Sequence, residues 1–104
     1  MEICFFDDSI KKFVASLEKL TIAKILRTLD LLEKFGRNLG LPHSKKVSKN
    51  LFELRVRGKQ EIRIFYAFSG SNIVLFHIFI KKSRKIPKKE INIALKKLKQ
   101  LDLI

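Results

Sequence analysis

Residues 51–90, LFELRVRGKQEIRIFYAFSGSNIVLFHIFIKKSRKIPKKE, decide the fold of this chain. In the first run of this stretch, Phe52, Leu54 and Val56 alternate with polar residues. Successive side chains of a strand point to opposite faces, so this alternation predicts a strand with one buried face. Arg55 then lies on the opposite face, together with the other polar residues of the run.

Two more strands are predicted in the same stretch. Residues 62–68 alternate in the same way, and residues 73–80 are apolar on both faces except at His77. Short turn signals at residues 58–59 and 69–72 separate the three runs. The pattern therefore predicts two consecutive hairpins, in which the third run is an interior strand with both faces covered.

Four cations accompany these strands. Arg55 and Arg63 are predicted to lie on neighbouring strands, and Lys81 and Lys82 follow the end of the third strand. Cations that a rigid sheet holds in place suit a phosphate group, because their positions are set before the anion arrives.

The remaining segments predict one strand and three helices. Residues 3–6 form a short apolar run, and apolar residues recur at helical spacing within 10–20 and 22–32. Pro87 is well placed to begin a third helix that carries an apolar stripe. Gly, Pro, Ser and Asn in residues 37–50 predict a basic, irregular loop.

The resulting order is β-α-α-β-β-β-α in a single α+β domain spanning residues 1–104. We expect a small, mostly antiparallel, twisted sheet with the two N-terminal helices packed on one face and a C-terminal helix. The face that carries Arg55 and Arg63 is predicted to be the more open one.

The chain is strongly basic, with 23 Lys and Arg against 10 Asp and Glu and a net charge of +13. This charge predicts a polyanionic partner, with nucleic acid first, an acidic membrane surface second and an acidic protein third. No apolar run approaches the roughly 18 residues of a membrane span, and no signal-peptide pattern precedes the domain. A single cysteine, Cys4, fits a reducing cytoplasm, and no metal-ligand spacing occurs.

Five short motifs occur in order over roughly residues 40–98, and together they resemble the phage-derived, HigB-like branch of the RelE/ParE toxin superfamily. The motifs are Leu41-Pro42, Leu51-Phe52-Glu53-Leu54-Arg55, Arg63-Ile64-Phe65-Tyr66, His77-x-Phe79-x-Lys81-Lys82 and Pro87-x-x-Glu90-x-x-x-Ala94. The resemblance also implies a RelE-like fold.

The resemblance implies a toxin of a type II toxin–antitoxin system that inhibits translation. Such toxins are ribosome-dependent mRNA endonucleases, which use the RNA 2′-hydroxyl and need no metal or other cofactor. The implied partners are the ribosome, mRNA and a HigA-like antitoxin with a helix-turn-helix domain. The toxin itself is expected to be cytoplasmic and monomeric outside that complex.

The resemblance also suggests roles for individual residues. Arg55 and Arg63 match the strand arginines that bind the phosphate. The catalytic set is predicted to comprise Arg55, Arg63, His77, Lys81 and Lys82. The RNA- and ribosome-binding set is predicted to comprise Lys45, Lys46, Lys49, Arg57, Phe65, Arg84, Lys85, Lys88 and Lys89.

Structural roles compete with these assignments. Arg55 and Arg63 can instead pair with Glu53 and Glu61 across the strands. His77 can be packed or hydrogen-bonded in the sheet. In the RNA-binding set, Phe65 can serve sheet packing rather than base stacking, and the lysines of the last helix can form a solvated face. Residues 90–104 lack the His or Tyr that some relatives place there, which leaves the general acid open.

Two other functions fit the same fold, since fold does not decide function. One is a ParE-like inhibitor of DNA gyrase without nuclease activity. The other is a catalytically weak RNA-binding relative. The cluster of cations favours the nuclease.

Overall fold

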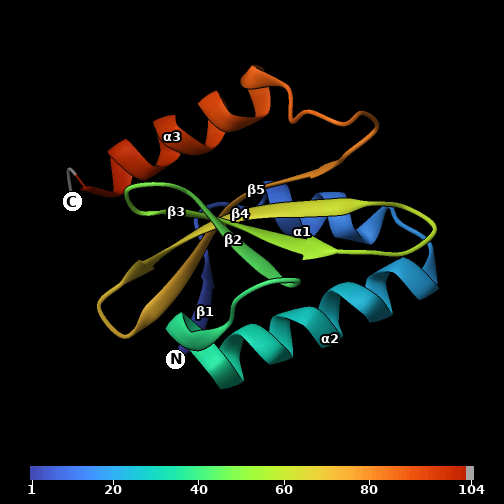
Figure 1. Cartoon of the computed structure of the whole chain (residues 1–104), viewed down its shortest axis with the longest axis horizontal. Coiled ribbons are helices and arrows are strands. Elements are labelled where there is room, and N and C mark those ends of the chain that lie inside the picture. Colours follow the sequence, from blue (N-terminus) through green and yellow to red (C-terminus); the bar gives the residue numbers. More distant parts are fainter. Residues whose placement is uncertain (103–104) are drawn as a thin grey trace.

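The computed structural model describes residues 1–102 and has an α+β fold with a five-stranded sheet (Figure 1). In chain order its elements are β1 (Glu2–Phe5), α1 (Ser9–Ala15), α2 (Lys19–Phe35), the 3-10 turn η1 (Gly36–Asn38), β2 (Ser44–Ser48), β3 (Leu51–Val56), β4 (Ile62–Ser69), β5 (Asn72–Ile80) and α3 (Lys88–Asp102). The predicted fold class is confirmed, with one strand more than the sequence pattern indicated.

The strands lie side by side in the order β1-β5-β4-β3-β2. Strand β1 runs parallel to β5, and every other neighbouring pair is antiparallel. The two predicted hairpins, β3–β4 and β4–β5, are therefore confirmed. In the register, Arg55 lies opposite Arg63, and Arg63 lies opposite Phe79.

Helices cover both faces of the sheet, and each face has its own hydrophobic core (Figure 1). On the α1/α2 side, Ile10 and Ile25 pack against Ile64. On the α3 side, Leu98 packs in a cluster that includes Phe76. Complete burial of one such side chain contributes about 1.5–3 kcal/mol to stability.

The prediction that the arginine face stays open is wrong over much of the sheet, because α3 packs on it. Two polar links fix the helix there. Lys97 Nζ donates to the Phe76 carbonyl at 3.0 Å and lies 3.0 Å from Asp7 Oδ2, which precedes α1. Nearer the start of α3, Glu90 Oε1 lies 3.3 Å from His77 Nε2 on β5. What remains open lies between the N-terminal end of α3 and the ends of β3 and β4.

The segment predicted as an irregular loop contains the edge strand β2. Ser44 pairs with Leu54 and Lys45 with Glu53 of β3. Alternation could not reveal this strand, because backbone pairing and not apolar burial holds most of it in place. At its start, the buried Ser44 hydroxyl is hydrogen-bonded to the Tyr66 hydroxyl. Burial raises the pKa of Tyr66, and the bond to Ser44 opposes that shift only in part.

The second helix begins earlier than its pattern predicted. The apolar stripe predicted its start near residue 22, but α2 starts at Lys19 with Glu18 as its N-cap, and Thr21 is buried inside the helix. Gly36 ends the helix, with a φ of 53° that suits a residue without a Cβ.

Candidate nucleic-acid interface

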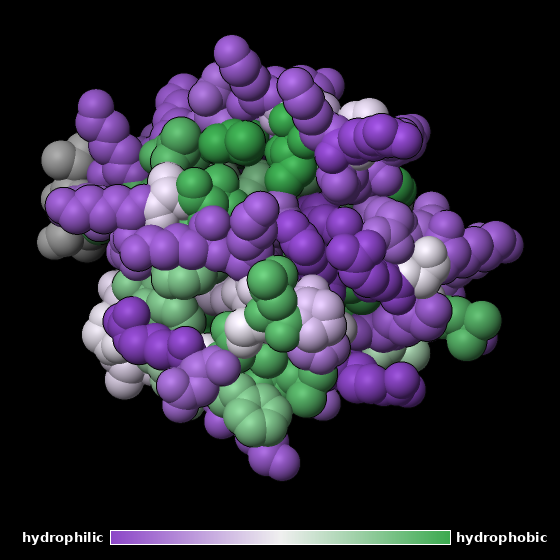
Figure 2. All heavy atoms as spheres, viewed as in Figure 1, coloured by the Kyte–Doolittle hydropathy of each residue, from purple (hydrophilic) through white to green (hydrophobic). Residues whose placement is uncertain are grey.

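An open hollow runs from the β3–β4 turn to the start of α3, and we call it the basic groove. Two adjoining parts of about 490 and 500 Å³ share Arg55, Lys81 and Arg84. The groove is lined by Lys45, Lys46, Val47, Glu53, Arg55, Arg57, Glu61, Arg63, Lys81, Lys82, Ser83, Arg84, Lys85, Ile86, Lys88 and Ile91. In Figure 2, hydrophilic side chains run along the upper edge and across the middle of this face, with a hydrophobic patch between them.

Arg55 lies where the two parts of the groove meet. Its Nε donates to Glu53 Oε1 at 2.6 Å, and the side chain is 21% exposed. Within the described chain, its two terminal nitrogens make no hydrogen bond. The bond from Nε to Glu53 orients the guanidinium. The two terminal nitrogens are therefore free to bind two oxygens of an anion.

Arg63 lies on the same face, but its side chain is only 3% exposed. Its Nη1 donates to the Ile62 carbonyl at 3.0 Å, and its Nη2 donates to Glu61 Oε1 at 3.2 Å. The Nε is buried without a hydrogen-bond partner, 3.7 Å from Glu53 Oε1. These contacts agree with the alternative reading of the sequence, in which Arg63 pairs with the two glutamates.

Two carboxylates, Glu53 and Glu61, organise the groove by pairing with its arginines. Glu53 is 4% exposed, and one oxygen faces both Arg55 and Arg63. Burial acts to raise the pKa of Glu61, but hydrogen bonds from Gly58 N–H and Arg63 and the charges of Arg63 and Arg57 outweigh it, so the pKa is lowered. The sequence could have indicated this role for Glu53, because the alternation of apolar and polar residues in β3 places Glu53 on the same face as Arg55.

Lys81 and Lys82 line the groove as expected from their place after β5. Lys81 is half-buried, and its backbone N–H donates to the Glu61 carbonyl at 2.7 Å. This bond fixes the start of the β5–α3 connection against the β3–β4 turn. The structure thus brings Arg55, Lys81 and Lys82 together.

His77 is not brought together with these cations. It lies on the arginine face, since it is opposite Phe65, but it is absent from the lining of the groove. Its ring stacks on Phe79 at 5.8 Å between centroids, and its Nε2 faces Glu90. The packed and hydrogen-bonded alternative therefore describes His77 in this structure.

The prediction that Phe65 stacks on a base is wrong for this conformation. Phe65 is 0% exposed and packs against Phe79, with ring centroids 5.6 Å apart. Helix α3 packs on the sheet face that carries Phe65, so a base cannot reach the ring. The pattern of a single strand does not show which helix packs on it.

The other cations predicted to bind RNA divide into two groups. Those that line the groove are Lys45, Lys46, Arg57, Arg84, Lys85 and Lys88. Lys49, in the β2–β3 turn, and Lys89, in the first turn of α3, are exposed but outside the lining. Arg57 also pairs with Glu61 at 3.3 Å.

Neither a metal cluster nor a membrane span is found in the described part of the chain. Residues 1–102 contain no group of three or more His, Cys, Asp or Glu placed to hold a metal ion. Of the helices within those residues, none is long and apolar enough to cross a bilayer.

The fold and the groove define a small, strongly basic α+β protein whose charge suits a polyanion. The family model of the phage-derived Gp49-like proteins (DUF891) matches residues 12–99, and the chain belongs to that family. This is a RelE-like family of toxin-like proteins, and such a family implies an antitoxin partner. A comparison with curated proteins finds no match.

Proposed function

We propose that this protein is the toxin of a type II toxin–antitoxin system, and that it is a ribosome-dependent mRNA endonuclease of the HigB-like branch. The observation that carries the proposal is the state of Arg55. Its Nε is held by Glu53, and its terminal fork is unpaired within the described residues, in a groove lined by ten cations and two carboxylates. Membership in a toxin-like family supports the same conclusion.

In the proposed reaction, the 2′-hydroxyl of the RNA attacks the adjacent phosphorus and the 5′-oxygen leaves. The groove contributes orientation and charge, which together lower the barrier of such a transfer. Arg55 binds two non-bridging oxygens of the phosphate, and Lys81 and Lys82 balance the charge that builds up on it. Arg63 is a positioning residue, because it holds Glu53, which in turn holds Arg55.

The proposed partners follow from the charge of the groove. The ribosome and mRNA supply phosphates to the cations of β2 and of the β5–α3 connection. A HigA-like antitoxin with a helix-turn-helix domain would inhibit the toxin by placing acidic side chains over the groove. Outside that complex, the toxin is proposed to be a cytoplasmic monomer.

The experiment is brief induction in a bacterium that lacks the antitoxin, followed by mapping of new mRNA 5′ ends. New ends within translated frames, which disappear when translation initiation is blocked, are the expected result. Growth arrest with intact mRNA would overturn the nuclease. DNA breaks in those cells would point to the ParE-like gyrase inhibitor, and normal growth would point to an RNA-binding relative.

A further inference from the structure

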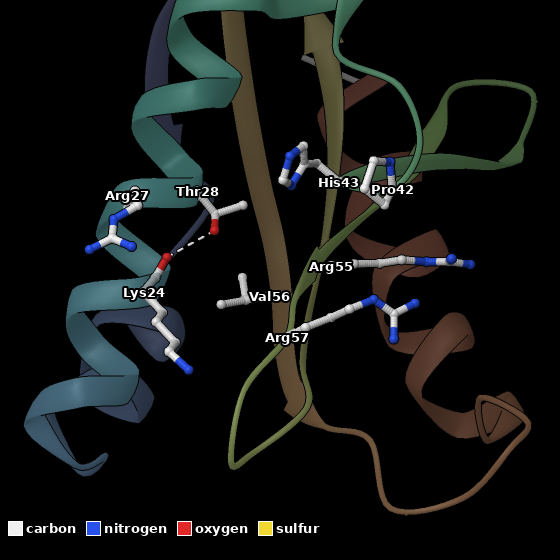
Figure 3. Close-up of a pocket in the computed structure, with 8 residues that line it drawn as sticks. All are labelled: Lys24, Arg27, Thr28, Pro42, His43, Arg55, Val56 and Arg57. Carbon is white, nitrogen blue, oxygen red and sulfur yellow. Dashed lines mark hydrogen bonds between the residues drawn. The ribbon is translucent and has the colours of Figure 1, made fainter.

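A second cationic pocket lies on the other face of the sheet, between α2 and β3 (Figure 3). It has a volume of about 220 Å³ and is lined by Lys24, Arg27, Thr28, His43, Val56 and Arg57, among others. In Figure 3, Lys24 and the His43 ring reach into the gap, and Arg27 stands at its outer rim, directed away from it. Of these residues, only Arg57 was predicted from the sequence to bind RNA.

Within the described chain, the two α2 cations of this pocket, Lys24 and Arg27, have no acidic partner. No carboxylate lines the pocket, and neither Lys24 nor Arg27 belongs to any of the ion pairs. Like charges close together on a helix are unfavourable unless something compensates them. This contrasts with the basic groove, where Glu53 and Glu61 lie among the arginines.

Both sides of the pocket lie close to β3 or its turn. Lys24 Nζ lies so close to the β3–β4 turn that a Cβ on Gly58 would stand 2.6 Å from it. On the other side, the His43 carbonyl accepts a 2.8 Å hydrogen bond from the backbone N–H of Arg55. The pocket is therefore tied to the strand that carries the proposed phosphate ligand.

Strand β3 connects the two cationic sites. Arg55 and Arg57 line both the pocket and the basic groove. Figure 3 shows both arginine side chains extending from β3 away from α2. An extended polyanion that leaves the groove beside Arg57 can pass around the β3–β4 turn and reach Lys24.

We propose that this pocket is a second binding site for RNA backbone phosphate, so that bound RNA contacts both faces of the sheet. Lys24 supplies charge within the pocket and Arg27 adds charge at its outer rim, and the His43 ring and Thr28 hydroxyl supply polar atoms beside Lys24. The proposal rests on the proposed function in taking RNA as the ligand. It concerns binding, so it can be tested whether or not the protein cuts RNA.

The test measures binding of a short single-stranded RNA and, separately, of 70S ribosomes, at several salt concentrations. The double variant Lys24→Ala/Arg27→Ala should bind roughly tenfold more weakly at moderate salt, and the slope of log K against log salt should fall by about 1–2. The matched control is Lys19→Ala/Lys34→Ala, which removes the same charge from exposed positions of the same helix. Thermal melts establish that both variants are folded.

A second variant keeps the net charge of the protein and displaces only the ammonium group of Lys24. Gly58→Ala places a methyl group 2.6 Å from Lys24 Nζ, so the ammonium must shift, whereas Gly40→Ala adds a methyl group in open space. Gly58→Ala should weaken RNA binding severalfold, and Gly40→Ala should leave it unchanged. If only ribosome binding is weakened, the phosphate in the pocket belongs to ribosomal RNA. If binding of both probes is weakened, it belongs to the bound single strand.

Two results would overturn the proposal. One is equal weakening by the pocket and control double variants, which would mean that only overall charge matters. The other is unchanged binding of both probes by Gly58→Ala. If RNA binding behaves as expected and no mRNA cleavage is found in cells, the pocket stands and only the nuclease proposal fails.

Discussion

Arg55 and Glu53 lie two residues apart on β3, on the same face, and are joined by a 2.6 Å hydrogen bond from Nε to Oε1. The same oxygen lies 3.7 Å from Nε of Arg63, which sits opposite Arg55 on β4. One carboxylate is thus shared by two arginines in different environments. Arg55 keeps a free terminal fork, and Arg63 is buried and bonded to protein groups at both terminal nitrogens. The two arginines should therefore respond differently to substitution.

Replacing Arg55 tests its assignment as the phosphate ligand. Arg55→Ala should lower mRNA cleavage by about 10²–10³-fold, because it removes a preorganised donor that stabilises the transition state. Cleavage would be read from mapped 5′ ends after induction. The control is Lys59→Ala, an exposed turn residue outside the groove, which should cleave normally. Wild-type cleavage by Arg55→Ala would show that another group binds the phosphate.

Replacing Arg63 should primarily reduce stability. Arg63→Ala removes a buried guanidinium that is bonded to Glu61 and lies beside Glu53, and the expected loss is about 1.5–3 kcal/mol in the free energy of unfolding. The matched control is Arg57→Ala, which pairs with the same Glu61 but has a 58% exposed side chain, and should lose less than about 1 kcal/mol. Urea denaturation measures both. Equal losses would contradict the structural role of Arg63.

Replacing Phe65 separates core packing from RNA contact. Phe65→Ala should reduce the free energy of unfolding by about 3–5 kcal/mol, because it opens a cavity between β4 and α3. Phe65→Leu should lose less stability and should bind RNA as the unsubstituted protein does. A folded Phe65→Leu protein with clearly weakened RNA binding would restore the stacking role that the structure contradicts.

Acid should weaken the link between α3 and the N-terminal part of the chain. A hydrogen bond from the Ser9 side chain, followed by the Lys97 contact, lowers the pKa of Asp7 from 3.8 to about 2 despite some desolvation. A carboxyl whose pKa is depressed on folding stabilises the native state above its unfolded pKa and loses that effect as pH falls toward its folded value. The contribution should therefore disappear between about pH 4 and pH 2.

The measurement is the urea midpoint from neutral pH to pH 2 for the unsubstituted protein and for Asp7→Asn. The variant should be less stable at neutral pH, and its curve should approach that of the unsubstituted protein at the acid end. Asp8→Asn is the control, since Asp8 is exposed and has no ion pair within residues 1–102. Parallel curves for Asp7→Asn and the unsubstituted protein would contradict the assignment.

Several elements could be predicted because their signal is local. The alternation in β3 and β4 reflects burial of one strand face at a time, and Gly36 ends α2 where its stripe ends. The edge strand β2 was missed because it is held by backbone hydrogen bonds to β3. Only Val47 within it is apolar, so it shows no alternating pattern. In the candidate site, Lys81 and Lys82 were placed correctly because they directly follow a recognisable strand.

By itself, the sequence determined the α+β class, the two hairpins, the basic character of the protein and the shared face of Arg55 and Arg63. Each of these depends on the order, spacing and charge of residues along the chain. Only the tertiary structure decided which arginine stays available. The distant helix α3 packs over Phe65, and the pairing of β3 with β4 lets Glu53 contact both arginines; in that arrangement Arg63 is buried and the fork of Arg55 stays free. Side-chain exposure is a property of the assembled layers, and a strand pattern carries no information about it.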